Sequence, residues 1–132
     1  MKLDIYVNYK GNCRKTFRFY QQHLGGKITS MMTFSQLPAS ANIPEGRQNK
    51  IMHARMEIGG PVLMGADIPN AEPMRSAYLT ITFDSAEEAE RVYELLSDEG
   101  EIFTKIQETS FASRYAMFRD RFGASWMLLC QC

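Results

Sequence analysis

The sequence contains the same succession of elements twice, and this internal repeat constrains the fold more than any other feature. In the first copy, residues 3–9 alternate between apolar and polar side chains, Gly11 turns the chain, and an amphipathic helix follows that ends at Gly25. About 74 residues later, residues 78–83 alternate again, and a second helix ends at Gly100. Alternation with a period of two predicts a strand with two distinct faces. Each copy therefore begins as a strand, a turn and a helix.

Each copy continues with three more strands, so both halves have the order strand, helix, strand, strand, strand. The predicted strands are residues 28–34, 51–58 and 62–64 in the first half, and 102–107, 114–119 and 126–130 in the second. Neither half has enough apolar surface to stand alone with one face of its sheet bare. We therefore predict an α+β fold in which two βαβββ modules form one eight-stranded curved mixed sheet, with the helices on the outer face and a cup inside.

Two prolines mark the boundary between the modules. Pro69 and Pro73 lie in a stretch without hydrophobic periodicity, which is typical of a linker. The boundaries follow as module one over 1–67, a linker over 68–76 and module two over 77–132. Because 132 residues is a common length for one domain, we expect the two modules to make a single domain.

The start of each predicted helix carries a capping residue. Asn12 can cap the first helix, and Ser85 with Glu88 forms a capping-box pattern at the second. The apolar positions of the first helix recur at helical spacing, at Cys13, Phe17, Tyr20 and Leu24. These positions predict the helix face that packs on the sheet.

Composition excludes several classes of partner. The chain has 15 basic and 15 acidic residues with no block of like charge, which argues against nucleic-acid binding. No apolar run is long enough for a membrane span, and no signal-peptide pattern follows Met1. We therefore expect a cytoplasmic protein without nucleic-acid or membrane partners.

The three cysteines are Cys13, Cys130 and Cys132. An odd number without a CxxC spacing predicts neither a disulfide framework nor a zinc site. The CxC pair at the end of the chain is interpreted as two small apolar residues of a final strand.

One long connection interrupts the first module. Residues 36–50 contain Pro38, Pro44 and Gly46 and show no periodicity. Connections of this length in compact domains are often lids or binding loops and sometimes disordered, and the sequence leaves both readings open.

Several short motifs resemble a known family. In the first half they are Gly11-Asn-Cys, Phe19-Tyr20 and Leu24-Gly25, and in the second Gln107-Glu108-Thr, Phe111-Ala and the run DRFGASWM over residues 120–127. Over its whole length the chain resembles the vicinal oxygen chelate superfamily, also called the glyoxalase/bleomycin-resistance/dioxygenase group. Within that group it is most similar to the PhnB-like branch. The resemblance implies two βαβββ modules facing each other across a cup.

The resemblance also implies where a metal would lie. Metal-dependent members hold a divalent ion with His, Gln or Glu from the first and last strands of each module, and the ion acts as a Lewis acid. The matching positions here are Asp4 or Ile5, Leu63 or Met64, Tyr78, and Met127. Thioether and neutral phenol groups are poor ligands for hard divalent cations. We therefore expect no cofactor and no metal site of the usual kind.

The predicted pocket is lined by aromatic, polar and methionine side chains. If Ala54 and Met56 pack on the helix, alternation turns His53, Arg55 and Glu57 toward the cup. The alternative for Arg55 and Glu57 is a face exposed to water. The predicted pocket residues are Tyr6, His53, Arg55, Tyr78, Glu108, Tyr115 and Met127, and His53 and Glu108 are the candidate catalytic residues.

Three functions remain open from the sequence. The first is a module that binds a small molecule in the cup without the usual metal. The second is a divalent-metal-dependent lyase, transferase or dioxygenase with a displaced site around His53 and Glu108. The third is an assembly unit without a ligand; open sheet edges predict a homodimer in any case. A methyltransferase activity, with which PhnB-like proteins are often labelled, has no support, because the sequence has no Gly-rich strand-to-helix turn.

Overall fold

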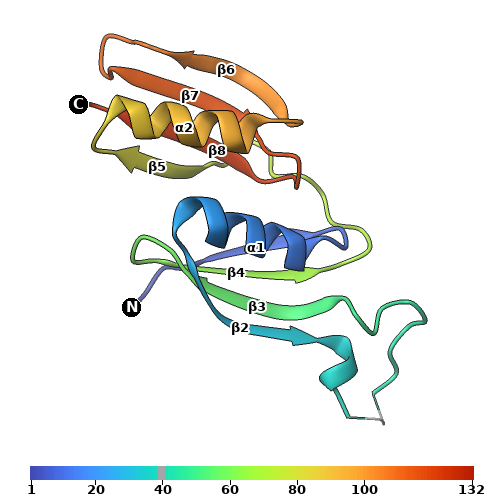
Figure 1. The fold of residues 1–132 in the computed structure, drawn as a ribbon. Coiled ribbons are helices and arrows are strands. Elements are labelled where there is room, and N and C mark those ends of the chain that lie inside the picture. The colour runs from blue at the N-terminus through green and yellow to red at the C-terminus, as the bar shows by residue number, and fades with distance from the viewer. Residues whose placement is uncertain (39–40) are drawn as a thin grey trace. The chain divides into compact units, whose positions relative to one another are not determined.

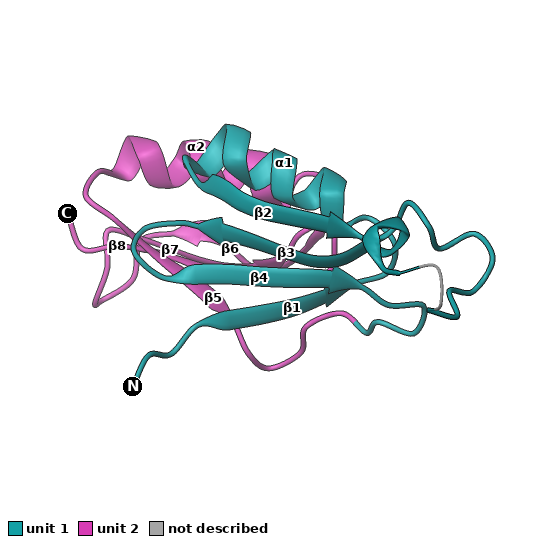
Figure 2. Cartoon of the chain, turned by 90° about the horizontal axis from the view of Figure 1, so that it is seen from below, with its two compact units in different colours: residues 1–72 teal, residues 73–132 magenta. Residues whose placement is uncertain are grey.

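The chain divides into two compact units. A computed structural model of the protein describes residues 1–38 and 41–132. The units are Met1–Glu72 and Pro73–Cys132, shown in two colours in Figure 2. The division falls inside the linker expected over 68–76. The loop expected over 36–50 includes residues 39 and 40, which lie outside the described residues, so its proposed role as a lid is not tested.

Unit 1 is a four-stranded mixed sheet with one helix on it (Figure 1). Its strands lie in the order β1-β4-β3-β2, with β1 parallel to β4 and the other pairs antiparallel. The elements are β1 (Ile5–Tyr9), α1 (Cys13–Leu24), β2 (Lys27–Thr33), the short 3-10 helix η1 (Phe34–Gln36), β3 (Ile51–Glu57) and β4 (Val62–Asp67).

Unit 2 repeats this arrangement with the strand order β5-β8-β7-β6. The first pair, β5 and β8, is again parallel, and the others are antiparallel. The elements are β5 (Leu79–Phe83), α2 (Ala86–Ser97), β6 (Glu101–Gln107), β7 (Arg114–Arg119) and β8 (Ser125–Cys130). The two predicted βαβββ modules are therefore confirmed.

The eight expected strands belong to two hydrogen-bonded sheets. In the described part of the chain, every strand pairs only with strands of its own unit. The predicted single sheet is thus corrected to two four-stranded sheets. In each module the first and last strands pair in parallel, β1 with β4 and β5 with β8, so backbone hydrogen bonds join the two ends of the module.

Helix α1 packs closely on its sheet, as the apolar spacing predicted. Cys13, Phe17 and Tyr20 are fully buried. Gly65 on β4 permits the close approach, because a Cβ atom there would lie 2.9 Å from Cε1 of Phe17. The ring of Phe17 also meets Tyr9 edge-on at 6.2 Å. This face of the sheet is the core of unit 1.

A remote carboxylate, rather than Asn12, caps α1. The predicted side-chain cap at Asn12 is absent. Instead, the backbone N–H of Cys13 donates to Oδ1 of Asp67 at 2.9 Å, and the N–H of Ile51 donates to Oδ2 at 2.9 Å. Asp67 is only 2% exposed. One buried carboxylate therefore joins the end of β4 to the starts of α1 and β3.

Helix α2 is capped locally, as predicted. The N–H of Glu88 donates to Oγ of Ser85 at 3.2 Å, and Glu87 and Glu88 lie in the first turn. Acidic side chains at the N-terminus of a helix interact favourably with the helix dipole. In the strand register, the unit 2 position that corresponds to Asp67 is occupied by Cys130. The second module thus needs no carboxylate from its last strand.

A second buried carboxylate, Asp120, holds the turn between β7 and β8. Its Oδ1 accepts hydrogen bonds from the N–H groups of Phe122 and Ala124 at 2.9 and 3.0 Å. Its Oδ2 accepts from Nε1 of Trp126 at 2.8 Å. Asp120 and Trp126 are 4% and 3% exposed. The most specific sequence motif of the chain therefore has a structural role.

We expect Asp120→Asn to lower the free energy of unfolding by about 2 kcal/mol, because a buried set of N–H donors loses its charged acceptor. Trp126→Phe removes the donor to Oδ2 and should cost a comparable amount. Asp98→Asn is the control, because Asp98 forms an exposed ion pair with Arg121 and its loss should cost less than about 1 kcal/mol. Urea unfolding followed by circular dichroism measures all three; equal effects of Asp120→Asn and Asp98→Asn would contradict the role given to Asp120.

Candidate functional site

Unit 1 presents a group of predicted pocket residues on the face of its sheet opposite α1. Gly65 and Met56 lie on the α1 side, so alternation places Met64 and Arg55 on the other side. Tyr6 and Arg55 both pair with Met64 in the strand register. We call Tyr6, His53, Arg55 and Met64 the helix-free face of unit 1.

Contacts on this face link its side chains in pairs. The ring of Tyr6 stacks near that of His53, with the centroids 6.2 Å apart. Nη1 of Arg55 lies 3.7 Å from Sδ of Met64. His53 and Arg55 are half-buried, whereas Tyr6 is 50% exposed. The structure thus brings the three predicted residues of the first module together on one surface.

Unit 2 presents a second group of this kind on the face opposite α2. Leu79, Phe118 and Trp126 are buried on the side that α2 covers, which leaves Thr80, Tyr115, Met117 and Met127 on the other. Met127 pairs with both Thr80 and Met117 in the strand register. The hydroxyl of Tyr115 donates to Sδ of Met117 at 2.9 Å. We call these four residues the helix-free face of unit 2.

Two more aromatic residues extend the helix-free face of unit 2. Tyr78, directly before β5, meets the ring of Phe103 edge-on at 6.4 Å. The guanidinium of Arg119 also lies over the Phe103 ring, with its Cζ 5.3 Å from the ring centroid. Sequence analysis missed Phe103 and Met117, although the alternation of residues 114–119 was the signal that could have found Met117.

The other predicted acidic residues, Glu108 and Asp4, lie just outside the strands, after β6 and before β1. Glu108 follows β6 and is exposed, and no described residue hydrogen-bonds or pairs with its carboxylate. The carboxylate of Asp4 contacts the start of β4, because its Oδ1 accepts a hydrogen bond from the N–H of Val62 at 3.2 Å. Its Oδ2 lies 3.7 Å from Nζ of Lys2. Asp4 thus serves the sheet rather than a pocket.

The positions implied for a metal carry side chains that do not fit one. Met64 and Met127 offer thioethers and Tyr78 a phenol, which are poor ligands for hard divalent cations. Across the described residues, no group of three or more His, Cys, Asp or Glu side chains is arranged to hold a metal ion. The described residues therefore lack the set of metal ligands that the resemblance implies.

The comparisons with known proteins decide the family. The family model described as "Glyoxalase/Bleomycin resistance protein/Dioxygenase superfamily" matches residues 2–128. The chain belongs to this superfamily. It is 32% identical to the Escherichia coli protein YjdN, over 97% of this chain and 94% of that protein.

Two solved structures share the fold over nearly the whole chain. Protein PA1353 from Pseudomonas aeruginosa is 35% identical, with a TM-score of 0.88 and coverage of 99% of this chain and 98% of that one. A Bacillus cereus PhnB protein, described as a putative 3-demethylubiquinone-9 3-methyltransferase, is 19% identical, with a TM-score of 0.82 and coverage of 98% and 99%. The second likeness, at 19% identity, shows the shared fold.

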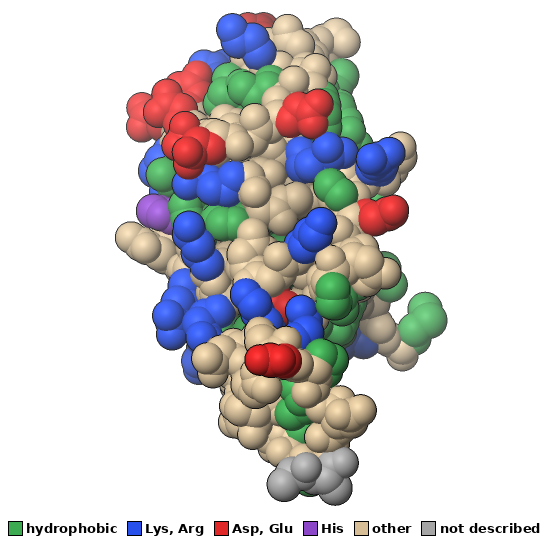
Figure 3. Space-filling view, turned by 90° about the vertical axis from the view of Figure 1, so that its right-hand side faces the viewer, with side chains coloured by type: hydrophobic (Ala, Val, Ile, Leu, Met, Phe, Trp, Pro, Cys, Tyr) green, Lys and Arg blue, Asp and Glu red, His purple; other side chains and the backbone are tan. Residues whose placement is uncertain are grey.

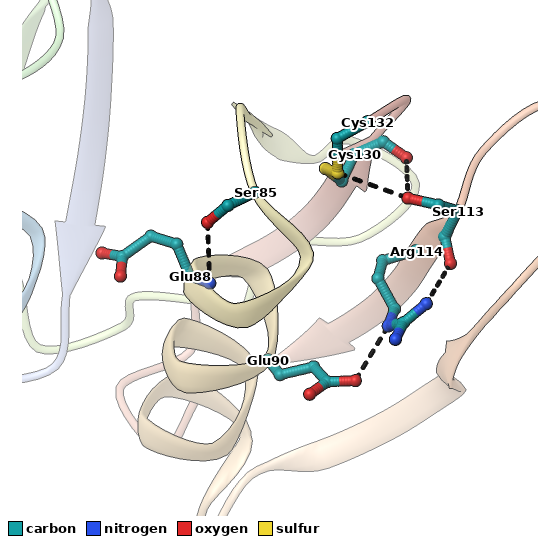
Figure 4. A network of polar contacts seen from close by, with 7 residues as sticks. All are labelled: Ser85, Glu88, Glu90, Ser113, Arg114, Cys130 and Cys132. Carbon is teal, nitrogen blue, oxygen red and sulfur yellow. Dashed lines mark hydrogen bonds and ion pairs between the residues drawn. A yellow bond between two sulfur atoms is a disulfide. The ribbon is translucent and has the colours of Figure 1, made fainter.

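The cysteine interpretation needs one correction. Cys130 and Cys132 form a disulfide rather than acting as two free apolar residues (Figure 4). Oγ of Ser113 lies 3.2 Å from the carbonyl oxygen of Cys130 and 3.4 Å from Sγ of Cys132. Next to it, Nε of Arg114 donates to Glu90 on α2 at 2.8 Å. The Cα atoms of the two cysteines lie 5.4 Å apart.

Cys13 is the remaining thiol, and it is buried at the start of α1. Burial, and then the nearby Asp67 carboxylate, raise the pKa of the Cys13 thiol to about 12. The thiolate is the reactive form of cysteine. Cys13 is therefore a neutral core residue and not a candidate nucleophile.

No helix in the described part of the chain is long and apolar enough to span a membrane.

We expect the native protein to show no thiol that reacts with Ellman's reagent at pH 8, because Cys13 is protonated and buried and the other two cysteines are bonded. Unfolding without a reductant should expose one thiol per chain, since an unfolded cysteine has a pKa near 8.5. Native reactivity should rise only as the pH approaches the raised pKa. Any fast thiol in the oxidised native protein would contradict this assignment.

Proposed function

We propose that this protein binds a small molecule on the helix-free faces of its two sheets, in the cup expected from the sequence, without the metal site usual in its superfamily. The observation that carries the proposal is the replacement of metal ligands by Met64, Tyr78 and Met127 on an otherwise complete superfamily fold. Methionine is flexible and polarisable, so it suits an adaptable apolar surface. The predicted Tyr115 and Tyr6 add aromatic contact area.

The polar groups on these faces indicate what such a ligand carries. Arg55 makes no ion pair with any described residue, so its guanidinium can bind an acidic or hydrogen-bond-accepting group. His53 beside Tyr6 can donate or accept a hydrogen bond. We therefore propose a mostly apolar ligand with one polar or anionic group. The methyltransferase description belongs to the Bacillus cereus protein, and this sequence gives no reason to adopt it.

We expect protein purified without a tag to contain much less than one divalent ion per chain, because the implied ligand positions carry thioethers and a phenol. Inductively coupled plasma mass spectrometry measures the ratio of metal to protein. Stoichiometric zinc, iron, manganese or nickel that survives dialysis would contradict the metal-free proposal.

The alternative function is a divalent-metal-dependent lyase, transferase or dioxygenase with a displaced site around His53 and Glu108. Two features that the first proposal does not explain favour it, namely the half-buried imidazole of His53 and the unpaired carboxylate of Glu108. It requires a divalent ion to raise the melting temperature. His53→Ala should abolish that rise, whereas His23→Ala, the matched control at the end of α1, should not. The metal-free proposal predicts no rise in any of the three proteins.

The expected homodimer stays a prediction. The two edge strands of each described sheet, β1 and β2 in unit 1 and β5 and β6 in unit 2, leave backbone groups available for pairing.

A further inference from the structure

The disulfide between Cys130 and Cys132 takes no part in the proposed function. It joins the last residue of β8 to the residue two positions later, with the Cα atoms 5.4 Å apart, which is within the usual range for disulfides. A disulfide stabilises a fold mainly by closing a long loop of the unfolded chain. This bond encloses one residue and links no two helices or strands, so it adds little to the stability of the fold. It is better suited to exchange than to holding the structure together.

The two cysteines of this bond differ in their access to solvent. Cys130 is 0% exposed, whereas Cys132 is exposed. Thiol–disulfide exchange begins when a thiolate attacks one sulfur of the bond, and access helps to decide which sulfur is attacked. An incoming thiol therefore reaches Sγ of Cys132 and not Sγ of Cys130. This asymmetry makes Cys132 the point of attack and Cys130 the leaving group.

Ser113 lies beside the bond and suits both of its redox states (Figure 4). The backbone N–H of Ser113 donates to the carbonyl oxygen of Cys130 at 2.8 Å, and its Oγ lies 3.2 Å from the same oxygen. Oγ is also 3.4 Å from Sγ of Cys132. After reduction, the S–H of Cys132 can donate to Oγ while the hydroxyl still donates to Cys130. The contacts around Ser113 therefore need no rearrangement when the bond opens.

We propose that Cys130 and Cys132 form a thiol–disulfide exchange site for small thiols of the glutathione class. Cys132 is the exchanging cysteine and Cys130 the resolving cysteine. The site lies within unit 2 and is independent of the proposal for the helix-free faces. A small thiol is favoured over a highly charged macromolecule, because the formal net charge is +0 and the face drawn in Figure 3 carries both basic and acidic side chains.

The exchange conserves atoms and electrons. A thiolate of the small thiol attacks Sγ of Cys132, forms a mixed disulfide and breaks the bond to Cys130, whose sulfur takes up a proton. A second thiolate attacks the small thiol's sulfur in the mixed disulfide, and Cys132 leaves as a thiolate that is then protonated. Two small thiols thus become one disulfide, and the cysteine pair gains two electrons and two protons. In the reverse direction, Cys132 attacks the oxidised small thiol and Cys130 resolves the mixed disulfide.

The test uses the full chain in two variants, Cys130→Ser and Cys132→Ser, reduced and then treated with oxidised glutathione. Intact mass spectrometry should find one glutathionyl group on Cys130→Ser, because Cys132 is exposed and has lost its resolving partner. Cys132→Ser should react at least about tenfold more slowly, because Cys13 and Cys130 are both 0% exposed. The reduced natural protein should form the internal disulfide and retain no glutathione.

Controls separate this chemistry from unfolding and from general exposure. Circular dichroism checks that each variant is folded, and Cys130→Ala replaces Cys130→Ser if serine is not tolerated at the buried position. In the Cys130→Ser background, Ser113→Ala should slow the addition of glutathione severalfold, because the Cys132 thiolate loses a hydrogen-bond donor. Ser110→Ala, at an exposed serine of the same connection, should leave the rate unchanged. Equal rates in these two variants would overturn the role given to Ser113.

Three results overturn the proposal as a whole. The first is equal labelling of Cys130→Ser and Cys132→Ser, which would remove the distinction between the exchanging and the resolving cysteine. The second is a folded Cys130→Ser that takes up no glutathione. The third is natural protein that stays reduced in equal concentrations of reduced and oxidised glutathione, because the bond would then be an incidental product of air oxidation.

Discussion

The buried carboxylate of Asp67 is the interaction on which the first module depends. It lies at the end of β4 and accepts hydrogen bonds from the N–H groups of the first residues of α1 and β3. Because one charged group satisfies both donors, the start of the helix is fixed to the sheet by residues 54 positions apart in sequence. This arrangement frees Asn12 from capping and leaves the first turn of α1 without acidic side chains.

The helix of the second module is capped in a different way. Ser85 caps α2 locally, and the carboxylate of this module, Asp120, holds the β7–β8 turn and the Trp126 indole. Asp120 and Trp126, two residues of the most specific family motif, therefore maintain the fold. Family membership can be read from them, whereas the chemistry has to be argued from Met64, Met127 and the side chains that surround them.

Much of the fold was predictable, because alternation and helical spacing are local signals. The two βαβββ modules, the buried face at Phe17 and Tyr20, and the cap at Ser85 followed directly from them. The cap at Asp67 was not predictable, because a lone aspartate at a strand end gives no sign of a partner far along the chain. The division into two sheets depends on backbone pairing, which side-chain patterns do not report. The Cys130–Cys132 bond was missed because an odd cysteine count was interpreted as the absence of any disulfide.

The candidate site was predictable in part for the same reason. Alternation grouped His53 and Arg55 on one face, but it gave no reason to include Phe103, which lies at an irregularity in the pairing of β6 with β7. Anomalous diffraction from crystals of the protein as purified tests the central claim most directly. The account predicts no divalent-metal peak beside His53, Met64 or Met127, and an organic molecule or water against the helix-free faces. A metal peak coordinated by His53 or Glu108 would contradict it.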